Sequence, residues 1–325
     1  MNDFPALARV DFHLRFKDAG RLPAYLGSAL RGALGHSLKR LVCVTRQPHC
    51  DGCLLQANCF HFRFFETPAR RPARNHPPPH PWVLEFNRET PQRVGPGEQM
   101  QFTLLLLDFA IENLAYLTLA IERAGEAGLG REALGFELQA VEAETPLGSG
   151  RRRPLYGAGD RAMRRLAPAA WRVPARPDAI RLQFLTPLRL KQYGDLVGPR
   201  EFTPGLLLDA VHRRIREFLL AYGRQPDRVF PERHAPGPLP GAFTRQWLRW
   251  RDWTRYSSRQ QTRMQLGGLV GEAQLDGRQL GEEGWRRLWL GQWLHAGKQS
   301  SMGLGQYRIV GPRKPAVADR PSRQG

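Results

Sequence analysis

The sequence contains no uninterrupted apolar run that approaches the roughly 18–20 residues a membrane-spanning helix needs. Its first residues also lack the basic stretch and apolar core of a secretory signal, so we expect a cytoplasmic protein with no membrane partner. A disordered chain contains few apolar residues. Apolar residues make up 41% of this sequence, which excludes a disordered chain. A length of 325 residues fits two domains, each with its own core.

Acidic residues are fewer than basic residues only in the second part of the chain. Residues 1–145 hold 16 Lys and Arg against 16 Asp and Glu, so the formal net charge of +19 belongs to residues 146–325. A basic half joined to a neutral half is typical of a protein that binds a polyanion. The alternative is a charged surface that only keeps the protein soluble.

The hydrophobic pattern predicts the same order of elements twice. Strand, helix, strand, strand, helix, strand is the ferredoxin-like order, which makes the expected fold class α+β with two tandem ferredoxin-like domains. The predicted elements of the first domain (1–145) are residues 8–16, 24–42, 82–86, 101–109, 111–128 and 136–144. Those of the second domain (179–312) are residues 180–191, 204–223, a hairpin of 252–263 with 266–275, 284–297 and 306–310.

The remaining segments have the composition of connections. Residues 146–178 are rich in Arg, Pro and Gly and are predicted to be a linker or a partly ordered arm. Residues 43–81 are an insertion in the first domain, and residues 313–325 are predicted to be a flexible tail.

Four cysteines, Cys43, Cys50, Cys53 and Cys59, lie within this insertion. In a cytoplasmic chain such a cluster favours a metal site over disulfides. Four thiolates would surround Zn²⁺ and leave no coordination position open, so the ion would be structural. An iron–sulfur cluster and unmetallated thiols are the alternatives, and His49 or His61 could replace one thiol.

The glycine-rich segments carry a resemblance to a known family. LGGLVGEAQL (266–275) followed by GKQSSMGLGQYRI (297–309) is similar to the glycine-rich signature of the RAMP superfamily. LRGALGHSLKRLVC (30–43) and RYSSRQQTRMQLGGLVG (255–271) narrow the resemblance to the CRISPR-associated endoribonucleases that process precursor RNA containing repeats.

Two basic segments are the candidate RNA-binding sites. In the glycine-rich loop, Gly297, Gly303 and Gly305 would let the backbone approach phosphates, and Lys298, Ser300 and Ser301 would donate hydrogen bonds. The alternative is a tight connection between helix and strand. In residues 245–263, tryptophans alternate with arginines, of which we expect Arg255 and Arg259 to face RNA. The tryptophans could instead form an apolar helix face.

His36 is the candidate catalytic residue. On the predicted helix it points about 140° away from the centre of the leucine stripe, with Gly32, Lys39 and Arg40 on its own face. The resemblance implies that a histidine on this helix is the general acid and base of a metal-independent reaction. In that reaction the ribose 2′-OH attacks the adjacent phosphorus, leaving a 2′,3′-cyclic phosphate and a 5′-OH.

Lys39 or Arg40 would stabilise the charge of the transition state. The resemblance also suggests a tyrosine, and Tyr25 lies on nearly the same face. Because eleven residues of straight helix span roughly 16 Å, Tyr25 could take part only if the helix broke near Gly32 or Gly35.

The expected function is therefore cleavage of CRISPR repeat RNA in precursor transcripts to give guide RNAs, with repeat RNA as the partner and other CRISPR effector subunits as further partners. One alternative is a non-catalytic RAMP subunit that binds guide RNA in an effector complex. Another is a zinc-bearing scaffold whose cysteine segment binds nucleic acid.

Overall fold

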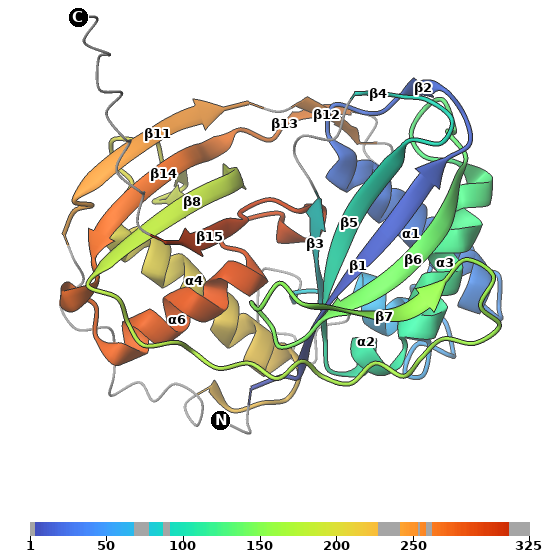
Figure 1. Ribbon diagram of the computed structural model, residues 1–325, viewed down its shortest axis with the longest axis horizontal. Coiled ribbons are helices and arrows are strands. Elements are labelled where there is room, and N and C mark those ends of the chain that lie inside the picture. Colours follow the sequence, from blue (N-terminus) through green and yellow to red (C-terminus); the bar gives the residue numbers. More distant parts are fainter. Residues whose placement is uncertain are drawn as a thin grey trace, which may run out of the picture.

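The computed structural model describes residues 4–67, 78–86, 92–226, 241–252, 254–257 and 262–311. Two antiparallel sheets follow each other along the chain, and each carries a pair of helices on one face (Figure 1). The predicted tandem ferredoxin-like fold is confirmed. We keep the names first domain for residues 1–145 and second domain for residues 179–312.

The first sheet has five strands in the order β3-β5-β1-β6-β7. These strands are β1 (Leu7–Phe16), β3 (Trp82–Phe86), β5 (Gln99–Leu107), β6 (Phe136–Glu144) and β7 (Arg152–Gly157). Its helices are α1 (Leu26–Val42), α2 (Phe109–Glu112) and α3 (Leu114–Ala127), with the π-helix η1 (Phe62–Glu66) after the cysteine segment. The short strands β2 (Gly20–Arg21) and β4 (Arg93–Val94) pair separately.

Successive side chains of β1 point to opposite faces of the first sheet, and only one of these faces is covered by helices. Val10, Phe12 and Leu14 are fully buried, and they pack with the leucines of α1 in one core. The intervening residues lie on the opposite face, where Arg9 and Asp11 belong to a network of ion pairs.

The second sheet has four strands in the order β11-β14-β8-β15. Its strands are β8 (Ala179–Leu188), β11 (Arg245–Arg251), β14 (Gly268–Asp276) and β15 (Tyr307–Val310), and its helices are α4 (Pro204–Ala221) and α6 (Glu282–Leu294). Smaller elements are β9 (Lys191–Gln192), β10 (Asp195–Leu196), β12 (Thr254–Ser257), β13 (Thr262–Gln265), and the 3-10 helices η3 (Gly277–Gln279) and η4 (Ser300–Met302).

The hairpin of the second domain differs from the prediction. The strand that pairs with β14 is β11, which precedes the predicted range 252–263, whereas β12, which lies within that range, pairs with β13. The tryptophans of β11 therefore lie on a strand and not on a helix face. Their spacing of three residues suggested a helix, and only pairing with a neighbouring strand distinguishes the two.

The predicted linker also contains regular structure. Residues 152–157 form β7, which pairs with β6 at the edge of the first sheet. The chain after β7 stays attached to both domains, because the Ala169 N–H donates to the Leu7 carbonyl and Trp285 Nε1 donates to the Pro174 carbonyl. Arg and Pro residues are typical of edge strands, so composition alone did not distinguish this strand from a loop. The predicted tail, 313–325, lies outside the described residues.

The apolar core of the second domain extends to the first sheet. Leu7, Val83 and Leu105 of the first sheet are buried in the same cluster as the residues of α4 and α6. A charged contact lies beside this core, where Arg308 of β15 donates to Glu85 of β3 over 2.7 Å. No helix in the described part of the chain is both long and apolar enough to cross a membrane.

Candidate active site and cysteine cavity

Helix α1 presents His36 to solvent. Leu30, Leu34 and Leu38 are buried against the first sheet, whereas His36 is exposed, as its position off the leucine stripe predicts. Gly32, one turn before His36, has no atom within 4 Å of the position a Cβ would take. No side chain therefore covers the helix surface at Gly32, next to the imidazole of His36.

The two cations after His36 have different surroundings. Lys39 is held by the cysteine segment, because its Nζ donates to the Pro48 carbonyl over 2.7 Å. Arg40 is exposed, and no acidic side chain among the described residues forms an ion pair with it. Of the two predicted cations, Arg40 is the one whose charge is available to a ligand near His36.

Tyr25 does not belong to this site. Helix α1 runs without a break from Leu26 to Val42, so the break that Tyr25 would need is missing and about 16 Å of helix separates it from His36. Tyr25 is buried, and its hydroxyl donates to the Met302 carbonyl of the second domain. The condition under which Tyr25 was expected to assist His36 is therefore not met, and its hydroxyl instead joins α1 to the glycine-rich loop.

The glycines of that loop approach protein rather than open surface. Gly303 and Gly305 have φ values of +86° and +73°, and both are buried. A Cβ on Gly303 would lie 2.7 Å from the Phe86 ring, and one on Gly305 would lie 1.8 Å from the Ala296 carbonyl. Glycine is thus required for packing of the loop against the first domain and against the segment after α6. The predicted approach of these glycines to phosphates stays a prediction.

The other predicted RNA contacts are divided. The Lys298 side chain is exposed, Ser301 is half-buried and Ser300 is buried. Arg255 lies in β12, opposite Met264 in β13, and Arg259 lies outside the described residues. Of the predicted loop donors, Lys298 and Ser301 are accessible to a ligand.

All four cysteines line one cavity of about 490 Å³ at the end of α1. They form no disulfide, and the Sγ atoms of Cys43 and Cys53 both lie 3.7 Å from the Thr45 hydroxyl. The Cys50 Sγ lies 3.8 Å from Nδ1 of His61, which also lines the cavity. The four cysteines therefore line the same cavity, and their binding of one metal ion stays a prediction.

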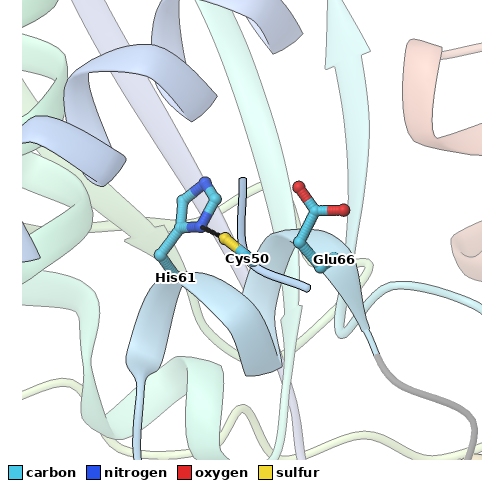
Figure 2. Close-up of side chains that lie close together, drawn as sticks. All are labelled: Cys50, His61 and Glu66. Carbon is cyan, nitrogen blue, oxygen red and sulfur yellow. Dashed lines mark hydrogen bonds between the residues drawn. The ribbon is translucent and has the colours of Figure 1, made fainter. Parts of the chain in front are cut away.

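Among the described residues, the group of potential metal-binding atoms that lie within 4.8 Å of one another is that of Cys50, His61 and Glu66. Figure 2 shows Cys50 and His61 facing each other, with Glu66 at the end of η1. Burial is the main factor that lowers the pKa of His61; the Glu66 carboxylate opposes it, and the positive charges of Lys39 and His36 add to the lowering. A neutral imidazole is the form that binds a metal.

Glu66 is the donor that the sequence analysis missed. It is brought beside His61 by the π-helical turn, whose i→i+5 pattern places residues five apart near each other. No sequence pattern predicts such a turn, so the pairing of these two residues becomes visible only in the structure.

Two family models match the sequence. A model described as the CRISPR-associated endoribonuclease Cas6 matches residues 182–307, and a model described as an N-terminal domain, AF_1859_N, matches residues 4–168. No curated protein matches the chain.

Several solved structures share the fold at low sequence identity. A Cas6 product complex has a TM-score of 0.53 and 16% identity and covers 94% of this chain and 99% of that one. A Thermus thermophilus Cas6 has a TM-score of 0.51 and 13% identity, with coverage of 94% and 99%. A partial Cas6-RT-Cas1–Cas2 complex has a TM-score of 0.53 and 14% identity, with coverage of 95% of this chain but only 46% of that one.

Proposed function

Because the chain belongs to the family of CRISPR-associated endoribonuclease Cas6, we propose that it cuts CRISPR repeat RNA in precursor transcripts to give guide RNAs. The observation that carries this proposal is an exposed histidine, His36, with the exposed cation Arg40 one turn later on a helix docked against the glycine-rich loop. The two side chains are close enough to act on one phosphodiester.

The reaction we propose for this site needs one imidazole and one cation. The imidazole of His36 takes the proton from the ribose 2′-OH, and the departing 5′ oxygen takes up a proton from the resulting imidazolium or from water. The 2′ oxygen forms a bond to the phosphorus as the bond to the 5′ oxygen breaks, so the products carry a 2′,3′-cyclic phosphate and a 5′-OH. The guanidinium of Arg40 stabilises the negative charge that builds up on the phosphoryl oxygens, and Lys39 fixes the neighbouring segment through Pro48.

Cleavage of the host's own repeat RNA in the presence of a chelator tests this proposal. We expect the wild-type protein to give the two predicted ends and the His36→Ala variant to lose at least about 100-fold in rate while its affinity for the repeat is kept. His13→Ala is the matched control, because His13 is a partly exposed histidine on β1 that pairs with Glu142 over 3.1 Å, and it should cleave normally.

The same experiment separates the nuclease from a non-catalytic guide-RNA-binding subunit. A wild-type protein that binds the repeat but leaves it intact would favour the binding subunit. Cleavage by His36→Ala at the wild-type rate would overturn the assignment of His36.

We further propose that the cysteine cavity holds a structural Zn²⁺ ion bound by Cys43, Cys50, Cys53 and Cys59. The residues fit the ion, since four free thiols line one cavity and thiolates are preferred Zn²⁺ ligands. The 3.8 Å between Cys50 and His61 is also short enough for both to bind one ion, so His61 is the residue that would replace a thiol. A closed set of ligands leaves no position for substrate, and no step of the cleavage passes through the metal.

The expected partners follow from the same family membership. We propose repeat RNA as the principal partner and other CRISPR proteins as further partners. One similar structure is a complex of a Cas6-RT-Cas1 protein with Cas2, and this chain spans 46% of the matched chain of that complex.

A further inference from the structure

Strand β11 presents an alternating set of residues on the face of the second sheet that carries no helices. The register pairs Arg245 with Gln274 and Trp247 with Glu272, and β14 in turn pairs Glu272 with Gln183 of β8. Residues that pair directly share a face. Arg245, Trp247, Arg249 and Arg251 therefore lie together on one face of the strand.

The opposite face of the same strands is the buried one. Leu182, Phe184 and Ala273 are fully or almost fully buried in the cluster that contains α4 and α6. Leu248 and Trp250, which alternate with the arginines of β11, pack against that cluster. The helices thus cover the side of the sheet away from Trp247, and β11 is one of the two edge strands, at the opposite edge from β15 (Figure 1).

Trp247 is the exposed tryptophan of the described part of the chain, with half of its surface (50%) accessible. Arg245, Arg249 and Arg251 beside it are exposed as well. An exposed tryptophan contributes no core packing, and between cations its ring is a surface on which a flat aromatic group can stack.

The charge of this face is positive. Glu272, opposite Trp247, has Arg181 of β8 at 3.9 Å, so its charge is matched within the sheet. Arg245 and Arg249 lie on either side of Trp247, each about 7 Å from it along the strand, and Arg251 follows about 7 Å after Arg249. Cations on both sides of the ring can bind the backbone of a strand whose base stacks on it.

We propose that this face is a binding site for unpaired RNA, in which one base stacks on Trp247 while Arg245 and Arg249 bind the flanking phosphates. The proposal rests on the proposed function, since it assigns a part of the same substrate to a surface outside the catalytic helix. A paired base has its faces covered by its neighbours, so a stacking surface of this kind selects single-stranded RNA.

The geometry connects this face with the catalytic helix. Strand β11 is followed by β12 and β13, and Leu266, which follows β13, packs with Tyr25 at the start of α1. A strand of RNA bound along β11 would therefore be led along the hairpin toward the N-terminal end of α1.

Binding of a fluorescein-labelled 12-nucleotide oligouridine, measured in the His36→Ala background, tests the proposal without cleavage. We expect Trp247→Ala to weaken binding at least about fivefold and Trp247→Phe to restore most of the affinity. Tyr193→Ala is the matched control, because Tyr193 is another aromatic residue of the second domain and is 98% exposed. It should bind as the parent does.

The arginines are tested by the salt dependence of the same binding. Arg245→Gln with Arg249→Gln should reduce the slope of log affinity against log salt by about 1.4, or 0.7 for each lost phosphate contact. A blunt 12-base-pair RNA duplex should bind Trp247→Ala and its parent alike.

Equal oligouridine affinity of Trp247→Ala and its parent would overturn the proposal, and so would an equal loss on the duplex. Neither result bears on cleavage, because the nuclease function is judged by the ends that the wild-type protein produces. A failure of the binding face can therefore be told from a failure of the proposed function.

Discussion

At the residue scale, two glycines of α1 have opposite environments. A Cβ on Gly27 would lie 1.9 Å from the Met302 carbonyl, whereas a Cβ on Gly32 would meet no atom within 4 Å. Alanine is favoured over glycine in a helix by about 0.5–1 kcal/mol. The surroundings of each glycine therefore decide whether a substitution to alanine raises or lowers the free energy of unfolding.

We expect Gly32→Ala to raise the free energy of unfolding by about 0.5–1 kcal/mol. Gly27→Ala should lower it by about 1–3 kcal/mol, because the new methyl group forces the glycine-rich loop away from α1. Urea unfolding of both variants checks this. If both variants had a higher free energy of unfolding than the wild type, α1 and the loop would not be in contact.

Single residues also show where sequence reasoning reaches its limit. The exposure of His36 follows from helical periodicity, which is a local property of the chain. The contact of Tyr25 with Met302 joins residues 277 positions apart, and no local pattern encodes it. The glycines of the loop were predicted to contact RNA, and the sequence does not reveal the neighbouring Phe86 ring and Ala296 carbonyl that leave no room for a side chain at Gly303 and Gly305.

At the scale of elements, the cysteine segment gives the sharpest prediction. We expect one Zn²⁺ per chain in the purified protein, and Cys50→Ser should lose the metal and unfold at lower urea concentration, since a ligand of the ion is removed. Asn58→Ala is the matched control, because Asn58 lines the same cavity without a metal-binding group. Elemental analysis and unfolding curves measure both effects.

Other results of that experiment have definite meanings. Iron and inorganic sulfide in the purified protein would identify an iron–sulfur cluster in place of zinc. Purified protein without metal would contradict the proposed zinc site and favour unmetallated thiols. Loss of RNA binding by Cys50→Ser with unchanged stability would favour the scaffold whose cysteine segment binds nucleic acid.

The elements themselves were predictable where hydrophobic periodicity is strong. Helix α4 and strand β1 lie within two residues of their predicted bounds, because each has one continuous apolar face. Strands β7 and β11 were missed or misplaced, because both are edge strands rich in Arg. Such strands are defined by hydrogen bonds to a neighbour, which composition does not show.

At the scale of the whole molecule, Glu85 connects the two domains. Its Oε2 accepts from Arg9 Nη2 over 3.0 Å within the first sheet, and its Oε1 accepts from Arg308 Nη2 over 2.7 Å from the second domain. His295 of the second domain lies 3.6 Å away. A carboxylate buried between the Arg9 and Arg308 guanidinium groups should hold the domains in one relative position.

The network gives stability a defined dependence on pH. Burial alone would raise the pKa of Glu85, but Arg308 and Arg9 hold it well below its usual value, with a smaller contribution from His295. The unfolded chain takes up a proton near pH 4.5 and the folded chain only at much lower pH. The stabilisation by Glu85 is therefore complete above about pH 5 and is lost as the pH falls below about 4.5.

Glu85→Gln should unfold more easily at pH 7, by about 3 kcal/mol, because Arg9 and Arg308 keep their charges without the carboxylate that neutralises them. Below about pH 4.5 the difference from wild type should shrink, because the unfolded wild-type chain then takes up a proton on Glu85 while the folded chain keeps this carboxylate ionised. Urea unfolding at pH 7, 5 and 4 measures this.

Glu137→Gln is the control: Glu137 pairs with Arg15 over 2.9 Å but is exposed, and surface pairs contribute little. If Glu137→Gln cost as much as Glu85→Gln, or if the difference at Glu85 stayed constant with pH, the contact between the domains would not depend on this charge.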